Sequence, residues 1–268
     1  MGIKTYTVDA FTDQPFTGNP AAICLLEEPL TEELMQQIAV EYNLSETGFI
    51  IRKSENHFGV RYFSPRQEIP LCGHATLSAA KILFMLDVQM NQVIFDTIGG
   101  LRLYCERRGD QIMMKFPLYD SVAIDLPEPM MQALGIDKAI ASRLAKDTKM
   151  LLLEIESEAV LRTIKPDFKA LVNSYTGIDG VIVTAKSESD YDFVSRYFWP
   201  WAGSDEDPVT GAAHTVLAKY WSDKLGKSQL HAYQVSQRGG FMFLELDEKG
   251  HLEITSSAVI MMTGDLRI

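Results

Sequence analysis

RYFSP at Arg61–Pro65 recurs as RYFWP at Arg196–Pro200, and PLCG at Pro70–Gly73 recurs shortly afterwards as PVTG at Pro208–Gly211. The two copies are separated by about half of the 268-residue chain. Solenoid repeats are much shorter, roughly 20–50 residues. The repeat therefore predicts two duplicated lobes, and two lobes that share a motif are expected to face each other across a ligand cleft.

Each copy leads into an apolar, alanine-rich stretch, His74–Leu86 in the first half and Ala212–Trp221 in the second. Both stretches are apolar on nearly every helical face, which is typical of a buried helix. Short strand-like segments surround the first of them: Ile3–Phe11, Ala21–Leu26, Phe49–Arg52, Val60–Phe63, Val93–Phe95, Leu101–Glu106 and Ile112–Phe116. We therefore predict an α+β protein with two pseudo-symmetric lobes, each a curled, barrel-like sheet around a central buried helix.

The lobe boundary is expected near Pro117–Pro127, where the apolar periodicity lapses. This gives an N-terminal lobe over 1–117, which the last C-terminal residues can complete, and a C-terminal lobe over 118–268. A second pair of similar segments, Thr97–Leu103 and Gln237–Phe243, extends the duplication beyond the helices.

Composition narrows the functional class. A net charge of −11, with no basic run longer than Arg107-Arg108, argues against a nucleic-acid partner. Three scattered cysteines form neither a disulfide framework nor a zinc pair. The N-terminus lacks an apolar signal core, and no apolar run approaches the roughly 20 residues of a membrane span. We expect a cytoplasmic protein without a membrane partner.

The duplicated turns predict an anion site. A helix start leaves backbone amides without intrahelical partners, and the helix dipole favours negative charge there. We expect a small carboxylate to bind between Gly73 and Gly211. The alternative is that both glycines only permit tight turns.

Four segments resemble the phenazine-biosynthesis PhzF-like family: Gly18–Ala22, Leu44–Thr47, Pro70–Thr76 and Glu206–Gly211. The resemblance covers essentially the whole chain and implies the diaminopimelate epimerase-like fold, a homodimer, and isomerase-type proton transfer without metal or organic cofactor. It implies that Glu46 is the acid/base carboxylate, with His74 and Asp207 in supporting catalytic roles. The implied substrate-binding residues are Asn19, Gly73, Thr210, Gly211 and Ala212.

Each assignment has an alternative. Glu46 could be a surface residue in a turn, His74 a structural donor in a buried helix, and Asp207 a cap of the second helix. By itself, the spacing of Cys72 and His74 is too sparse to predict a metal site.

Two departures from related sequences limit the inference. Epimerases of this fold resemble one another in having a cysteine at both helix starts, whereas Thr210 stands opposite Cys72 here. Many relatives have serine where this chain has Ala212, which puts the phenazine substrate itself in doubt. The remaining alternatives are a racemase or epimerase that uses Glu46 and Cys72, and a catalytically idle binding protein.

Overall fold

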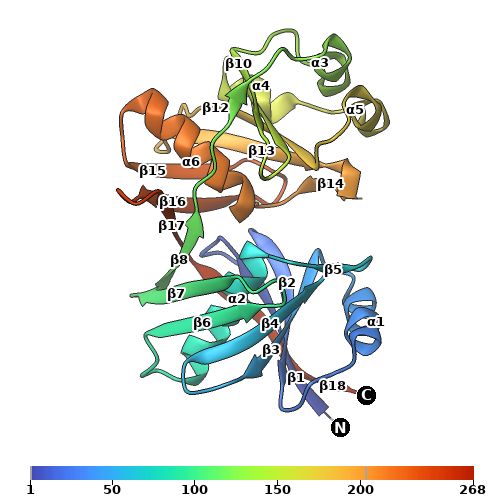
Figure 1. Cartoon of the computed structure of the whole chain (residues 1–268), viewed down its shortest axis with the longest axis vertical. Helices are drawn as coiled ribbons and strands as arrows, with labels where there is room; N and C mark the ends of the chain where they lie inside the picture. The colour runs from blue at the N-terminus through green and yellow to red at the C-terminus, as the bar shows by residue number, and fades with distance from the viewer. Residues whose placement is uncertain (1, 203) are drawn as a thin grey trace. The chain divides into compact units, whose positions relative to one another are not determined.

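The computed structural model describes residues 2–202 and 204–268. The chain divides into two compact units: unit 1 runs to Phe116 and resumes over Glu253–Ile268, and unit 2 comprises Pro117–Leu252. Each unit combines a curled sheet with one long buried helix, so the predicted α+β class is confirmed (Figure 1).

In unit 1 the strands pair in the order β18-β1-β2-β3-β4-β6-β7-β8, with the short β5 on β4. The β2–β3 and β4–β6 pairs are parallel and the others are antiparallel. The elements are β1 (Gly2–Ala10), β2 (Asn19–Leu26), α1 (Glu32–Tyr42), β3 (Glu46–Arg52), β4 (His57–Phe63), β5 (Glu68–Ile69), α2 (Gly73–Leu86), β6 (Gln92–Thr97), β7 (Arg102–Arg108), β8 (Gln111–Pro117), β17 (His251–Ser256) and β18 (Ala258–Arg267).

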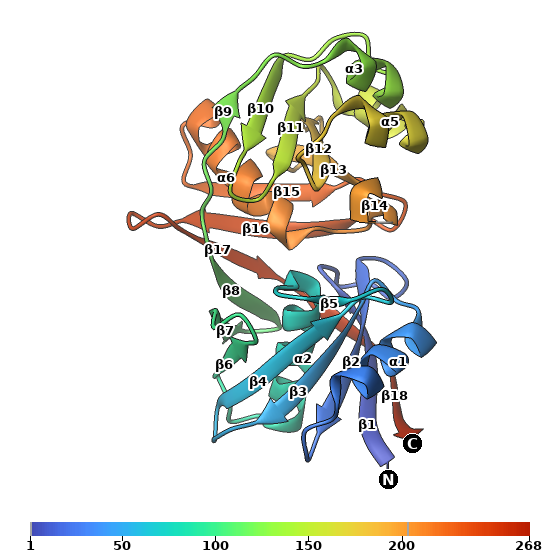
Figure 2. The ribbon, with the colours of Figure 1, turned by 45° about the vertical axis from the view of Figure 1, so that its right-hand side comes forward.

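The two helices of unit 1 cover opposite faces of its sheet. α1 is capped by Thr31, whose side chain accepts from the Leu34 amide, and its buried side packs on Phe49 and Phe63. α2 lies within the curve of the strands and contacts β1, β2 and β3 (Figures 1 and 2). Ten α2 residues are buried, as expected for a helix that is apolar on nearly every face.

Unit 2 repeats the same pairing pattern. β10, β11, β12, β13, β15 and β16 follow one another, with β11–β12 and β13–β15 parallel and the short β14 on β13. The elements are β9 (Val122–Ala123), α3 (Glu128–Leu134), β10 (Ala141–Ala145), β11 (Met150–Glu154), α4 (Glu158–Thr163), α5 (Phe168–Ser174), β12 (Gly180–Lys186), β13 (Phe193–Trp199), η1 (Pro200–Ala202), β14 (Ser204–Asp207), α6 (Gly211–Leu225), β15 (Gln229–Gln234) and β16 (Gly240–Leu246).

The repeated RYF segment forms the end of β4 in unit 1 and of β13 in unit 2. Side chains alternate across a strand, so the arginine and phenylalanine share one face and the tyrosine points to the other. The Arg61 guanidinium lies 5.2 Å from the Phe63 ring centroid and makes two 2.6 Å hydrogen bonds to Glu68. Arg196 repeats this arrangement, 4.8 Å from the ring of Phe198 and bonded to Glu206 at 2.7 and 2.8 Å.

These arginine–glutamate pairs hold the short strand that precedes each buried helix, β5 in unit 1 and β14 in unit 2, against its neighbouring strand. In unit 1, Tyr62 pairs with Ile69 and Phe63 with Glu68. In unit 2, Tyr197 pairs with Asp207 and Phe198 with Glu206. Asp207 therefore occupies the position in unit 2 that Ile69 occupies in unit 1.

Unit 2 has one core on each side of its sheet. α3, α4 and α5 cover one face, where Leu151, Val183 and Phe198 are buried. On α6, Trp221 stacks on Phe193 of β13, with the ring centroids 5.5 Å apart and the planes inclined by 4°. Among the described residues no helix is long and apolar enough to cross a membrane.

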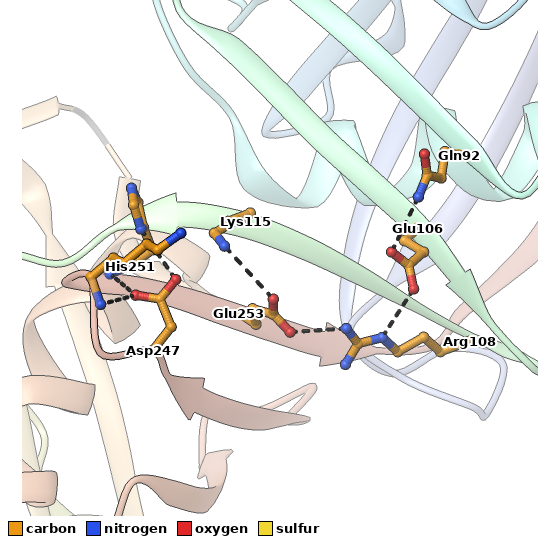
Figure 3. A network of polar contacts seen from close by, with 8 residues as sticks. Gln92, Glu106, Arg108, Lys115, Asp247, His251 and Glu253 are labelled. Carbon is orange, nitrogen blue, oxygen red and sulfur yellow. Dashed lines mark hydrogen bonds and ion pairs between the residues drawn. The ribbon is translucent and has the colours of Figure 1, made fainter.

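Charged side chains tie β17 of unit 1 to its neighbours (Figure 3). Glu253 accepts from Arg108 of β7 at 2.9 Å, and Lys115 of β8 lies 3.9 Å from it. β17 also pairs with β8 through the backbone. The returning end of the chain is thus an integral part of the unit 1 sheet.

Candidate active site

Glu46 is the first residue of β3. α1 ends at Tyr42, its C-cap residue Asn43 adopts the left-handed conformation at φ 50°, and Glu46 then pairs in parallel register with Ala21 of β2. The Glu46 side chain is 5% exposed, so Glu46 is not a surface turn residue.

The start of α2 brings two further polar groups to Glu46. Cys72 is the N-cap residue in an extended conformation, and His74 is the second residue of the helix. His74 Nε2 lies 3.0 Å from Glu46 Oε2, and Cys72 Sγ lies 3.4 Å from His74 Nδ1. All three side chains are buried, and we call them the Glu46–Cys72–His74 cluster.

Side chains of α2 and β4 fix the start of α2, where Cys72 and His74 of the cluster lie. Thr76 Oγ1 donates to the Cys72 carbonyl at 2.6 Å and is itself 2.6 Å from the hydroxyl of Tyr62. Tyr62 is the tyrosine of the repeated segment, 1% exposed and on the face of β4 opposite its arginine. The repeat motif therefore has a structural role, because it anchors the start of the helix that carries Cys72 and His74.

The charge states in the cluster follow from burial and proximity. Burial acts to lower the pKa of His74, but the neighbouring Cys72 and Glu46 outweigh it, and the net pKa lies well above its ordinary value. Burial raises the pKa of the Cys72 thiol, and Glu46 acts in the same direction against the opposing effect of His74. At neutral pH we expect a protonated His74 beside a neutral Cys72 thiol.

The donor atoms of the three side chains all lie within 4.8 Å of one another. A group of this kind can take up, hold and pass on a proton, since His74 contacts both other members. Carboxylate, thiol and imidazole are also metal ligands, although the sequence spacing alone had not indicated a metal site.

In unit 2 the start of α6 has a different polar arrangement. Asp207 ends β14, and its Oδ2 accepts from Thr210 Oγ1 at 2.5 Å. The N-cap residue of α6 is Thr210, so the alternative that Asp207 caps this helix is wrong. Gly211 is buried and Ala212 is exposed in the first turn.

A residue missed at the sequence level, Gln234, holds this arrangement in place. Gln234 is fully buried at the end of β15 and accepts from the Thr210 amide at 2.9 Å. Its Nε2 donates to the Asp207 carbonyl at 2.7 Å and to Thr210 Oγ1 at 3.2 Å. No motif connects Gln234 to Thr210, because only the parallel pairing of β13 and β15 brings it there.

The two remaining predicted residues are in unit 1. Asn19 is fully buried at the start of β2, and Gly73 is the first residue of α2. Gly18 precedes Asn19 at φ 69°, and a Cβ there would lie 2.2 Å from the Ala10 carbonyl oxygen, so only glycine fits. The structure thus groups Glu46 with His74 in unit 1, and Asp207 with Thr210, Gly211 and Ala212 in unit 2.

A curled sheet that encloses a long buried helix in each unit is the diaminopimelate epimerase-like fold, which the solved structures similar to this chain share. The phenazine biosynthesis-like PhzC-PhzF model matches residues 8–264. The chain belongs to this family.

Curated relatives match along the whole chain. The human phenazine biosynthesis-like domain-containing protein is 40% identical, with 99% of both chains covered. An uncharacterized isomerase of Halalkalibacterium halodurans is 41% identical, again over 99% of both chains. The crystal structure of a PhzF family phenazine biosynthesis protein from Enterococcus faecalis superposes with a TM-score of 0.94 at 37% identity, covering both chains completely. The predicted family and fold are confirmed, and family members carry the name isomerase.

Proposed function

We propose that this protein is an isomerase that moves a proton within a small carboxylate-bearing metabolite, with Glu46 as the acid/base group. The observation that carries the proposal is the 3.0 Å contact between the buried Glu46 carboxylate and His74. A carboxylate that is shielded from water and held in position by a hydrogen-bonding neighbour is suited to act as base and acid in one cycle. The relative named isomerase supports the same class of reaction.

In the proposed reaction Glu46 takes a proton from a carbon next to an activating group and returns it to another carbon of the same molecule. His74 stabilises the Glu46 carboxylate by donating a hydrogen bond to it. Because His74 also contacts Cys72, a proton can pass between the side chains of the cluster through His74. Acid–base groups positioned in this way typically contribute about 10²–10⁴-fold to a rate.

The contribution proposed for unit 2 is substrate recognition. Asp207 offers a carboxylate for a substrate hydroxyl or amine, and Thr210 and Gln234 hold it in one orientation. The first amides of α6 provide donors for a substrate carboxylate, since helix starts favour anions. A ligand with both groups, a hydroxy- or amino-carboxylate, fits this description best.

The racemase alternative, with Glu46 and Cys72 as two opposed bases, lacks support from the geometry. Two groups that attack one carbon from opposite faces each lie about 3–3.5 Å from it, so they are separated by about 6–7 Å. The donor atoms of Glu46, Cys72 and His74 all lie within 4.8 Å of one another. The cluster therefore fits one side of a substrate better than both sides.

The test is an incubation of the purified protein in D₂O with a panel of small hydroxy-, amino- and unsaturated carboxylates, followed by NMR. A product with a shifted double bond supports the isomerase, an inverted stereocentre supports the epimerase, and binding without deuterium uptake supports the idle protein. Glu46→Gln must lose the activity, and Glu33→Gln, an exposed glutamate on α1, must keep it.

A further inference from the structure

The N-cap residues of the two long buried helices behave unlike those of α1, α4 and α5. Thr31, Ser157 and Asp167 each accept a hydrogen bond from a backbone amide at the start of their own helix. Cys72 of α2 and Thr210 of α6 make no such bond. A side-chain cap stabilises a helix, so both buried helices lack a stabilising contact at this position.

Thr210 uses its side chain to hold a functional group instead. Its Oγ1 donates to Asp207 Oδ2 at 2.5 Å and accepts from Gln234 Nε2 at 3.2 Å. The threonine at the same position of α1, Thr31, does cap its helix, so the residue type does not decide which bond is made. In unit 2 the N-cap residue therefore orients the carboxylate that we propose to recognise the substrate.

Cys72 has the corresponding position in unit 1, and its side chain contacts His74. Cys72 Sγ lies 3.4 Å from His74 Nδ1 and 3.8 Å from Nε2, so the sulfur lies against the imidazole ring. On the same ring, Nε2 lies 3.0 Å from Glu46 Oε2. The torsion that rotates a histidine ring is broad and roughly two-fold, so contacts outside the residue have to select one orientation. Rotation of the ring by half a turn would move Nε2 away from Glu46.

Both N-cap residues are themselves fixed from within their helices. The Cys72 carbonyl accepts from Thr76 Oγ1 at 2.6 Å, and the Thr210 carbonyl accepts from His214 Nδ1 at 2.8 Å. In each unit, a side chain four residues further along the helix thus holds the N-cap residue. Supporting contacts of this kind keep a functional group in one geometry.

We propose that Cys72 is a positioning residue, whose side chain holds the His74 ring in the orientation in which Nε2 faces Glu46. The sulfur packs against an imidazole in unit 1, whereas the hydroxyl of Thr210 donates to a carboxylate in unit 2. The two helix starts therefore carry different residues because the groups that they orient differ.

The consequence for catalysis rests on the proposed function, in which His74 serves the acid/base group Glu46. A displacement of about 1 Å can lower a rate about 10²-fold. Loss of the Cys72 contact should therefore lower kcat and leave KM nearly unchanged. The orientation of the ring is measurable without any substrate, so it is tested separately from turnover.

The experiment is NMR of the imidazole groups in the unaltered protein and in Cys72→Ala. The Nε2–H proton of His74, which is buried against Glu46, should give one slowly exchanging resonance in the unaltered protein, assigned by its absence in His74→Gln. Cys72→Ala should lose this resonance, because the ring then exchanges between orientations. Cys24→Ala and Cys105→Ala are matched controls, because both replace buried free cysteines elsewhere in unit 1, and both should keep it.

These controls separate positioning from a structural role, since removal of any buried thiol leaves a small cavity. Cys72→Ser is a second variant with the same expected loss, because serine is a preferred N-cap residue and its hydroxyl should turn to the helix amides. Chemical denaturation verifies that each variant is folded.

Two results would overturn the proposal: two sets of His74 ring signals in the unaltered protein, or an unchanged Nε2–H resonance in folded Cys72→Ala. In either case the isomerase proposal would still stand if Glu46→Gln abolishes turnover. Loss of the resonance in Cys72→Ala supports the positioning role even when no tested carboxylate is turned over.

Discussion

Glu46→Gln should lower the pKa of His74. In the unaltered protein the pKa of His74 lies well above its ordinary value, because Cys72 and Glu46 together outweigh the opposing effect of burial. The substitution removes the carboxylate, so that only Cys72 still opposes the effect of burial. His214 shows the effect of burial without such neighbours, because it is fully buried and burial lowers its pKa to about 4.

The magnitude of the burial effect follows from His214. Burial lowers its pKa from 6.5 to about 4, which corresponds to about 3 kcal/mol at about 1.4 kcal/mol per pKa unit, and the neighbours of His74 outweigh an effect of this kind. In the unaltered protein, the stability due to His74 is fully present below the ordinary histidine pKa and is lost as pH rises through the raised pKa. In Glu46→Gln the pKa of His74 is lower, so this contribution to stability becomes smaller and is lost at a lower pH.

The assay is NMR titration of the imidazole nitrogens in both proteins, accompanied by chemical denaturation at several pH values. Glu33→Gln controls for the loss of one negative charge on an exposed position of α1. A His74 pKa that is unchanged in Glu46→Gln would refute the reasoning, since the carboxylate would then not be one of the groups that raise it.

Three further predictions concern the framework and unit 2. Phe193→Ala should cost about 3–5 kcal/mol in free energy of unfolding, because it leaves a cavity beside Trp221; calorimetric melting measures it, and a loss below about 1 kcal/mol would contradict the packing. Arg196→Met should destabilise more than Arg61→Met, because Arg196 also donates to the Leu161 and Ile164 carbonyls and is less exposed; denaturation midpoints of both variants compare them, and the reverse order would be inconsistent with this account. Asp207→Asn should erase a preference for hydroxy- or amino-carboxylates over matching plain carboxylates in titration calorimetry, whereas equal affinities in the unaltered protein would rule out the recognition role.

The sequence predicts the architecture well because the duplication can be recognised from short stretches of sequence. Strand alternation, the two turns and the apolar helices are properties of short segments, and the structure confirms α2 and α6 as buried helices that begin at Gly73 and Gly211. The strands and helices over 128–195 were not predicted. They belong to unit 2, where nearly continuous apolar strands such as Met150–Glu154 carry no alternation to read.

The candidate site is predictable only in part. The resemblance indicates Glu46, His74 and Asp207, and the structure adds the contacts of Cys72 with His74 and of Thr210 with Asp207. The role of Gln234 and the contact between Glu46 and His74 depend on segments that are distant in the sequence. Parallel strand pairing and the position of the helices create these contacts, so they cannot be predicted from the spacing of residues along the chain.

The central claim is that Glu46 moves a proton between two carbons of a small carboxylate. The most direct measurement follows deuterium at each carbon of a substrate by NMR during turnover in D₂O, with the chelator-treated protein and with Glu46→Gln. We expect deuterium at the carbon that receives the proton, and a rate lowered about 10²–10⁴-fold in Glu46→Gln with the fold intact. Undiminished deuterium uptake in folded Glu46→Gln would contradict the account.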